Sequence, residues 1–153
     1  MDVSGKIAFR PAASPDIQRM WEIDQVCFDP GIAYAVDVFY FHMLVHRDPA
    51  FVAEENGRII GFVMTAMEKR DEGLIVTIDL LPEWRAKGIG SRLIALAEEA
   101  LIKRGAQKVV LQTAVENHPA IAFYQKHGYR NMKTLKHYYG RGKPAFQFEK
   151  TLP

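Results

Sequence analysis

The segment Arg85-Ala86-Lys87-Gly88-Ile89-Gly90 contains the residue types that bind a phosphate group. Two glycines two positions apart allow a tight turn and expose neighbouring backbone N–H groups. Arg85, Lys87 and Arg92 add positive charge, and Ser91 adds a hydroxyl donor. An amphipathic helix is expected to begin at Gly90, so its unpaired N–H groups and the positive end of its dipole would face the same point. The segment therefore predicts a site for a phosphate or pyrophosphate.

This loop differs from the two commoner phosphate loops. It lacks the Gly-Lys-Ser/Thr ending of a P-loop and the third glycine of the dinucleotide fingerprint. A Gly-x-Gly pair alone is equally compatible with a plain turn. The surrounding residues favour the phosphate site: Pro82 precedes the pair, Arg85 lies three residues before Gly88, and a long amphipathic helix follows.

The elements that must position this loop follow from the hydrophobic spacing. Strands are expected at residues 7–10, 51–53, 59–67, 74–81 and 109–115, and a closing hairpin at 133–139 and 145–151. Helices are expected at residues 16–28, 36–46, 90–104 and 119–127. A strand-helix-strand unit over residues 74–115 implies a parallel pair with a right-handed crossover, and the hairpins imply antiparallel neighbours. We expect a mixed α/β sheet with helices on both faces.

Three motifs carry a resemblance to a known family. The segment Arg85–Gly90 resembles motif A of the GNAT superfamily of N-acetyltransferases, Arg/Gln-x-x-Gly-x-Gly/Ala. Residues 112–124 are similar to the family's next motif, with Asn117 and Tyr124, and residues 124–129 resemble its Tyr-x-x-x-Gly-Phe element. Tyr138-Tyr139 before a glycine-rich turn resembles the branch that acetylates N-terminal amines, in particular the RimI-like ribosomal-protein-alanine acetyltransferases. The resemblance covers residues 7–152.

The resemblance implies the fold, the cofactor and its contacts. The fold would be the GNAT fold, a mixed, mostly antiparallel sheet with a central splayed parallel strand pair, in one acetyltransferase domain spanning residues 1–153. Acetyl-CoA would be the co-substrate, with its pantetheine arm on the backbone of Ile78, Asp79 and Leu80. The implied cofactor-binding residues are Ile78, Asp79, Leu80, Arg85, Ala86, Lys87, Gly88, Ile89, Gly90, Ser91, Asn117 and Tyr124.

The implied reaction is a direct attack of a neutral amine on the thioester, within a ternary complex. A backbone N–H near Leu80 would stabilise the oxyanion. Tyr124 is the candidate catalytic acid, because a phenol can protonate the leaving thiolate. Its alternative role is that of a core tyrosine, three residues after Ile121 on a helix.

The proton acceptor is not assigned by the motifs. Gln112 and Leu74 occupy positions where relatives carry a base, and neither accepts a proton usefully. The alternatives are Glu116, His118, Asp79 and Asp29, each of which is equally explained as a solvated or capping residue. At pH 7 about 10% of an α-amine is neutral, against roughly one lysine in 2,500. The missing base therefore favours an α-amine substrate, or a base elsewhere.

The amine substrate is expected to lie between two loops. The candidate substrate-binding residues are Asp29, Tyr34, Gln112, Tyr138 and Tyr139. The substrate is expected to be a protein or peptide N-terminus. Two alternatives remain open: an acetyltransferase for a small amine, and a non-catalytic acyl-CoA-binding protein.

Composition excludes several other classes. The net charge is +2 and basic residues are spread along the chain, so no nucleic-acid partner is expected. No apolar run reaches the roughly 18 residues of a membrane span, and Met1–Lys6 has no apolar core of signal-peptide length. The chain has one cysteine, Cys27, and so no internal disulfide, which suits a reducing cytoplasm. We expect a monomer or a weak dimer. His42 and His46 lack the zincin glutamate between them, so no metal site is expected.

Overall fold

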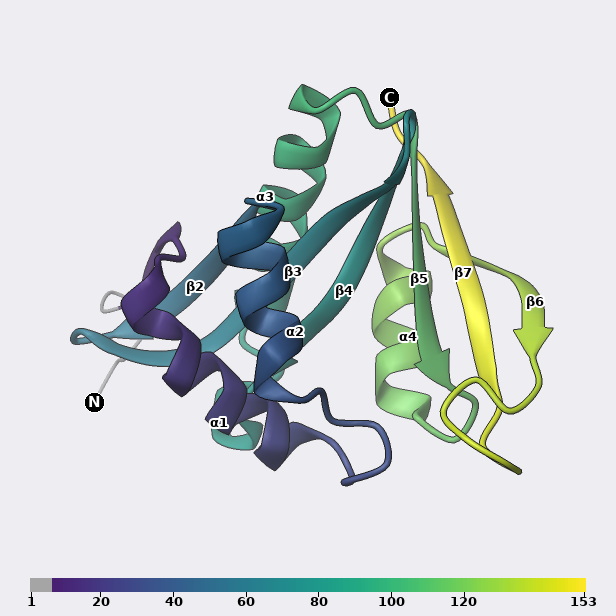
Figure 1. Cartoon of the computed structure of the whole chain (residues 1–153), viewed down its shortest axis with the longest axis horizontal. Helices are drawn as coiled ribbons and strands as arrows, with labels where there is room; N and C mark the ends of the chain where they lie inside the picture. Colours follow the sequence, from purple (N-terminus) through teal and green to yellow (C-terminus); the bar gives the residue numbers. More distant parts are fainter. Residues whose placement is uncertain (1–6) are drawn as a thin grey trace.

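The computed structural model describes residues 7–153, and Met1–Lys6, considered above for a leader, lies outside this range. Seven strands form a single sheet in the order β1-β2-β3-β4-β5-β7-β6 (Figure 1). Every neighbouring pair is antiparallel except β4 and β5. The strands are β1 (Ile7–Pro11), β2 (Ala50–Glu55), β3 (Arg58–Lys69), β4 (Glu72–Leu80), β5 (Lys108–Ala114), β6 (Arg130–Leu135) and β7 (Ala145–Thr151). The helices are α1 (Ile17–Cys27), α2 (Val36–Tyr40), α3 (Ile89–Lys103) and α4 (His118–Lys126).

The predicted elements are present, most of them with bounds that differ by one or two residues, and two of them differ in type or extent. The helix expected over residues 36–46 is α-helical to Tyr40 and continues as a π-helical turn over Phe41–Val45. The strand expected over residues 133–139 is β6, which begins at Arg130 and ends at Leu135. His137 has a φ of 60°, a left-handed conformation that a strand cannot contain. Tyr138 and Tyr139 therefore lie in the turn after the strand.

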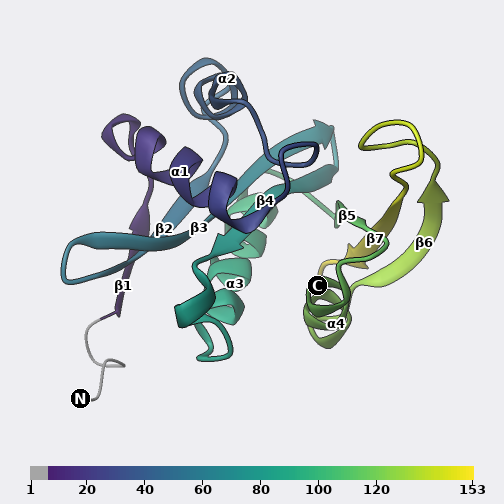
Figure 2. The same ribbon diagram turned by 90° about the horizontal axis from the view of Figure 1, so that it is seen from below.

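Helices cover both faces of the sheet, as the sequence predicts (Figure 2). On one face, α1 and α2 bury Ile17, Met20, Ile23 and Phe39 against β2 and β3. On the other, α3 buries apolar residues at helical spacing, which include Ile89, Leu93, Ala97 and Leu101. Between residues 7 and 153, no helix combines the length and apolar character needed to cross a membrane.

The parallel pair β4–β5 is joined over a short length. Partners are Glu72 with Lys108, Gly73 with Val109, and Leu74 with Val110. Beyond these three positions the two strands diverge, although β4 continues to Leu80 and β5 to Ala114 (Figure 1). The sheet therefore opens in its middle, at the end of β4 that leads into the glycine loop.

A bulge in β4 lies beside this opening. Met64 of β3 pairs with Thr77 and its neighbour Thr65 pairs with Ile75, so Val76 is an extra residue on β4. An extra residue changes which face the following side chains occupy. Ile75 belongs to the core on the α3 side, Val76 contacts the core on the α1 side, and Asp79 reaches α1.

Candidate active site

The loop between β4 and α3 contains a left-handed turn directly before the helix. Ala86 and Gly88 have φ values of 60° and 85°, and Gly88 is the N-cap residue of α3. The first helical bond joins the N–H of Arg92 to the carbonyl of Gly88 at 3.2 Å. The preceding N–H groups of α3 thus have no helical partner and face the loop. A Cβ placed on Gly88 would meet nothing within 4 Å, so the space beside this residue is open.

Gly90 has a different role from Gly88. A Cβ on Gly90 would lie 3.1 Å from Cε1 of Phe123 in α4. Gly90 thus allows the first turn of α3 to pack closely against α4, whereas Gly88 supplies the left-handed turn. The sequence assigned both glycines to the turn alone.

Two side chains expected near the phosphate already have partners in the protein. Arg85 Nε donates to the carbonyl of Leu80 at 3.0 Å, and its Nη2 lies 3.7 Å from Cys27 Sγ. Ser91 Oγ lies 2.9 Å from His127 Nε2. These contacts fix the two ends of the loop, to β4 and to α4.

Several backbone groups on the open side of β4 already have partners. Tyr34 Oη donates to the carbonyl of Val76 at 3.2 Å, and the Leu80 carbonyl accepts from Arg85 and Cys27. The N–H of Leu81 bonds the carbonyl of Ile60 in β3. By strand alternation Asp79 also turns its backbone toward β3, and Ile78 turns its own toward the opening. Of the three predicted pantetheine contacts, Ile78 is thus the best placed.

Tyr124 lies in the core at the opening. Its side chain is 8% exposed, and its ring centroid lies 6.0 Å from that of Tyr129. Within residues 7–153 its hydroxyl has no hydrogen-bond partner. Burial, followed by the charges of Asp79, Tyr139 and Tyr34, raises the pKa of Tyr124 above its ordinary value. The hydroxyl is therefore protonated at physiological pH, as an acid must be.

Asn117 is the N-cap residue of α4. Its Oδ1 accepts from the N–H of Ala120 at 3.2 Å, and Pro119 occupies the first turn. Tyr124 lies two turns further along the same helix. Asn117 thereby positions Tyr124, in addition to the cofactor contact that the resemblance implies.

The candidate substrate residues come from three segments. Gln112 of β5 donates to Gln147 Oε1 at 3.0 Å and accepts from the Tyr138 hydroxyl at 3.3 Å. The rings of Tyr138 and Tyr139 are perpendicular, with centroids 4.9 Å apart. Burial and then the nearby Tyr138 raise the pKa of Tyr34, which places the two tyrosines in one environment.

The two substrate-side loops touch each other. A Cβ on Gly31 would lie 2.6 Å from Lys143 Nζ, so the α1–α2 loop contacts the β6–β7 loop. Asp29 is exposed, and its carbonyl accepts from the N–H groups of Ile32 and Ala33. Asp29 therefore shapes the first loop through its backbone.

The structure separates the four candidate bases. Glu116, His118 and Asp29 are exposed, whereas Asp79 is 2% exposed and lies beside the opening. Leu74 lies where β4 and β5 are still paired.

Asp24 of α1 was missed by sequence reasoning, although it is completely buried and contacts Asp79. Its signal was a carboxylate on an apolar helix face, four residues after Met20 and seven after Ile17.

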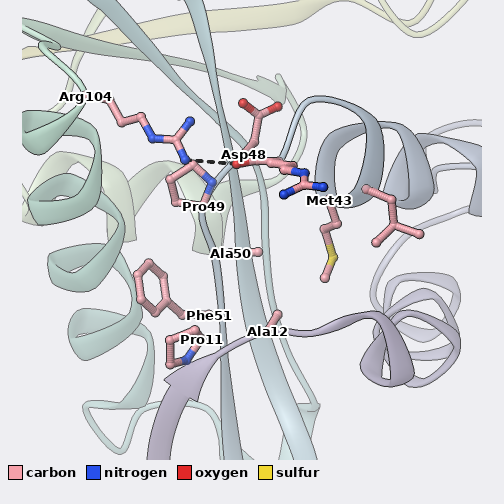
Figure 3. A pocket seen from close by; sticks show the side chains of 10 residues that line it. Pro11, Ala12, Met43, Asp48, Pro49, Ala50, Phe51 and Arg104 are labelled. Atoms are coloured by element: carbon pink, nitrogen blue, oxygen red, sulfur yellow. Dashed lines mark hydrogen bonds between the residues drawn. The ribbon is translucent and has the colours of Figure 1, made fainter.

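A hollow of about 470 Å³ lies elsewhere, between the start of β2, the π-helical turn and the end of α3 (Figure 3). None of the site residues predicted from the sequence lines it, and Arg104 closes one side by donating to the carbonyl of Arg47 at 2.9 Å. Beside it, Asp48 Oδ2 lies 2.9 Å from His42 Nδ1 and 3.7 Å from His46 Nδ1. The sequence analysis considered His42 and His46 as a pair and did not identify Asp48 as their neighbour.

Comparison with known proteins shows the family to which this chain belongs. The acetyltransferase (GNAT) family matches residues 17–129. The chain belongs to the GNAT acetyltransferase family. An N-alpha-acetyltransferase of Sulfurisphaera tokodaii is 30% identical over 149 residues, covering 90% of this chain and 88% of the relative. A putative [ribosomal protein bS18]-alanine N-acetyltransferase of Bacillus subtilis is 29% identical over 137 residues, covering 88% and 87%.

Solved structures agree on the fold. Ard1 from Thermoplasma volcanium superposes with a TM-score of 0.86 at 21% identity, covering 97% of this chain and 99% of that one. The NatC complex bound to Gag peptide and CoA includes a chain with a TM-score of 0.85 at 22% identity, with the same coverage. The predicted GNAT fold, the resemblance to the RimI-like branch and the acetyl-CoA-dependent N-acetyltransferase class are confirmed.

Proposed function

We propose that this enzyme transfers the acetyl group of acetyl-CoA to the N-terminal α-amine of a protein or peptide. The observation that carries the proposal is the divergence of β4 and β5 after three paired residues. The backbone of Ile78 borders the opening on one side and the buried side chain of Tyr124 lies on the other, next to the phosphate loop. A thioester held there has an N–H donor and an acid at hand.

The choice of an α-amine has two supports. The relatives named above act, by their names, on α-amines or on a protein's alanine. In addition, the family's usual base positions hold Gln112 and Leu74, and an α-amine needs far less help to lose a proton than a lysine does. The contact between Gly31 and Lys143 bounds the substrate side, which suits the slender end of a peptide.

We assign the substrate side to Tyr34, Gln112, Tyr138 and Tyr139, and the cofactor side to Ile78 and the N–H groups of residues 85–91. We further propose that the enzyme works in the cytoplasm, as a monomer or weak dimer and a single domain.

Thiol release from acetyl-CoA tests the proposal. The panel is a set of peptides that differ in the first residue, the same peptides with a blocked N-terminus and one internal lysine, and free amines such as a polyamine. Turnover of unblocked peptides alone is the expected result. Turnover of free amines but no peptide would assign a small-amine acetyltransferase. No turnover with any amine, together with a higher Tm in acetyl-CoA, would assign a non-catalytic acyl-CoA-binding protein.

A further inference from the structure

Two carboxyl groups are buried in contact with each other beside the opening. Asp79 of β4 is 2% exposed and Asp24 of α1 is 0% exposed. The Asp24 carboxyl lies close enough to Asp79 to raise the pKa of the Asp79 carboxyl. An ionised carboxylate only accepts hydrogen bonds, so two neighbouring carboxyls can bond to each other only if one of them carries a proton.

The remaining contacts of the two carboxyls lead to the same requirement. The Thr77 hydroxyl donates to Asp79 Oδ1, and the N–H of Tyr34 donates to Asp24 Oδ2 at 2.7 Å. The other oxygens, Asp79 Oδ2 and Asp24 Oδ1, are inaccessible to solvent and have no hydrogen-bond partner. In the part of the chain that the structure covers, no lysine or arginine forms a salt bridge with either group. One proton shared between the carboxyls supplies the missing donor.

The pair lies among the groups assigned to the reaction. The charge of Asp79 acts on Tyr124 in α4 and on Cys27 in α1, so these side chains share one environment. The titratable groups that face Asp79 are Asp24 and Cys27 from α1, Tyr34 from the α1–α2 loop, Arg85 from the loop after β4, and Tyr124 from α4.

We propose that Asp24 and Asp79 form a proton-holding pair, and that the pair, once it has lost the shared proton to solvent, accepts the proton released by the attacking amine. The inference rests on the proposed function. The N–C bond forms as one N–H bond breaks, and that proton moves to the pair. The C–S bond then breaks and the thiolate takes the hydroxyl proton of Tyr124. The proton held by the pair restores the Tyr124 hydroxyl, so the enzyme returns to its starting state with N-acetylated amine and CoA thiol as products.

The environment of Asp79 suits this role. Burial, and then the hydrogen bond and charge of Asp24, raise the pKa of the Asp79 carboxyl well above its ordinary value. A base works best when its pKa lies near the working pH. Because the pair must be ionised to accept a proton, activity rises as pH rises through the pKa of the pair.

Three isosteric variants test the proposal by steady-state kinetics with one peptide. Asp79→Asn and Asp24→Asn each remove one carboxyl, and Asp71→Asn changes an exposed aspartate in the turn before β4. Each of the first two is expected to lower kcat about 100-fold, with the KM for acetyl-CoA changed less than about threefold and the pH-dependent rise of kcat flattened. The double variant is expected to be no slower than either single one, because the two groups act as a unit. If Asp79→Asn or Asp24→Asn retains the wild-type kcat and pH profile, as Asp71→Asn is expected to, the pair is not the acceptor.

A second readout needs no turnover. The folded chain binds a proton that the unfolded chain releases, so the wild type loses stability as pH rises from the ordinary aspartate pKa through the pKa of the pair. Asp79→Asn has a neutral amide in place of the carboxyl, so its stability does not fall with rising pH for this reason. Its Tm relative to wild type is expected to increase between pH 5 and pH 9. Parallel Tm curves would show that no proton is shared. If no amine were acetylated, the proposed function would fail, but the Tm comparison would still test whether Asp24 and Asp79 share a proton.

Discussion

Phe123 of α4 lies against the backbone of Gly90 in the first turn of α3, so that a Cβ at position 90 would lie 3.1 Å from Cε1 of the ring. This contact sets the spacing between the helix that begins at the phosphate loop and the helix that carries Tyr124. An error in that spacing would displace the pyrophosphate site relative to the acid.

Gly90→Ala is therefore expected to destabilise the fold by about 1 kcal/mol, because the overpacking cost of about 1–3 kcal/mol exceeds the roughly 1 kcal/mol that Ala gains over Gly in a helix, and to raise the KM for acetyl-CoA. Urea unfolding and thiol-release kinetics measure the two effects. Phe123→Leu in the same chain makes room for the methyl group and is expected to recover part of the loss. If Gly90→Ala lowers stability equally in the wild type and in Phe123→Leu, the contact with Phe123 is not the cause of the loss.

Tyr124→Phe is expected to lower kcat about 100-fold with little change in acetyl-CoA binding, because the ring packing remains and only the hydroxyl is lost. The raised pKa of Tyr124 keeps the hydroxyl protonated through pH 9, so Tyr124 causes no fall in the wild-type rate up to that pH. The matched control is Tyr129→Phe, which loses the hydrogen bond from its hydroxyl to Glu98 at 2.8 Å. That control is expected to lose about 1–2 kcal/mol of stability and to keep kcat. A Tyr124→Phe enzyme at full rate would remove the proposed acid.

The thiol of Cys27 is expected to react slowly with alkylating reagents. Burial, and then the charge of Asp79, raise the pKa of Cys27 to about 11. Only the thiolate reacts, and at pH 8 a pKa of about 11 leaves about one thiol in 1,000 ionised, against roughly a quarter for an ordinary cysteine. Mass spectrometry of iodoacetamide-treated protein gives the rate without ambiguity, since the chain has one cysteine. Alkylation as fast as that of an unfolded control would contradict this environment.

Asp16→Asn is expected to lower the free energy of unfolding by about 1–2 kcal/mol at pH 7. Asp16 Oδ2 accepts from Arg10 Nη1 and from the N–H of Ala13, both at 2.8 Å. The hydrogen bond with Arg10 holds the pKa of Asp16 below its ordinary value. This stabilisation is present above the ordinary aspartate pKa and is lost as pH falls through the lowered one. The two proteins should therefore converge in urea unfolding curves near pH 3, and a constant gap from pH 7 to pH 3 would refute the charge-dependent part.

The sequence identified the elements that follow from local spacing. The helical spacing of Ile89, Leu93 and Ala97 predicted α3, and Asn117 or His118 was predicted as the cap of α4, which the structure assigns to Asn117. It did not reveal the bulge at Val76 or the contact between Asp24 and Asp79. Residues 24 and 79 lie 55 positions apart, and their contact depends on which face of β4 follows the bulge. Spacing along one element carries no information on such a contact, although a carboxylate on the apolar face of α1 marks the position as unusual.

The three-position pairing of β4 with β5 also has a mechanical consequence. Strands β1–β4 and strands β5–β7 form two blocks whose hydrogen-bonded connection is a narrow seam. A molecule that bonds the backbone of Ile78 extends that seam and stiffens the joint between the blocks. Amide exchange should then slow in both blocks when acetyl-CoA binds, and thermal resistance should increase with its concentration, since ligand binding stabilises only the folded chain. The co-substrate would in this way serve as a removable part of the scaffold that holds it.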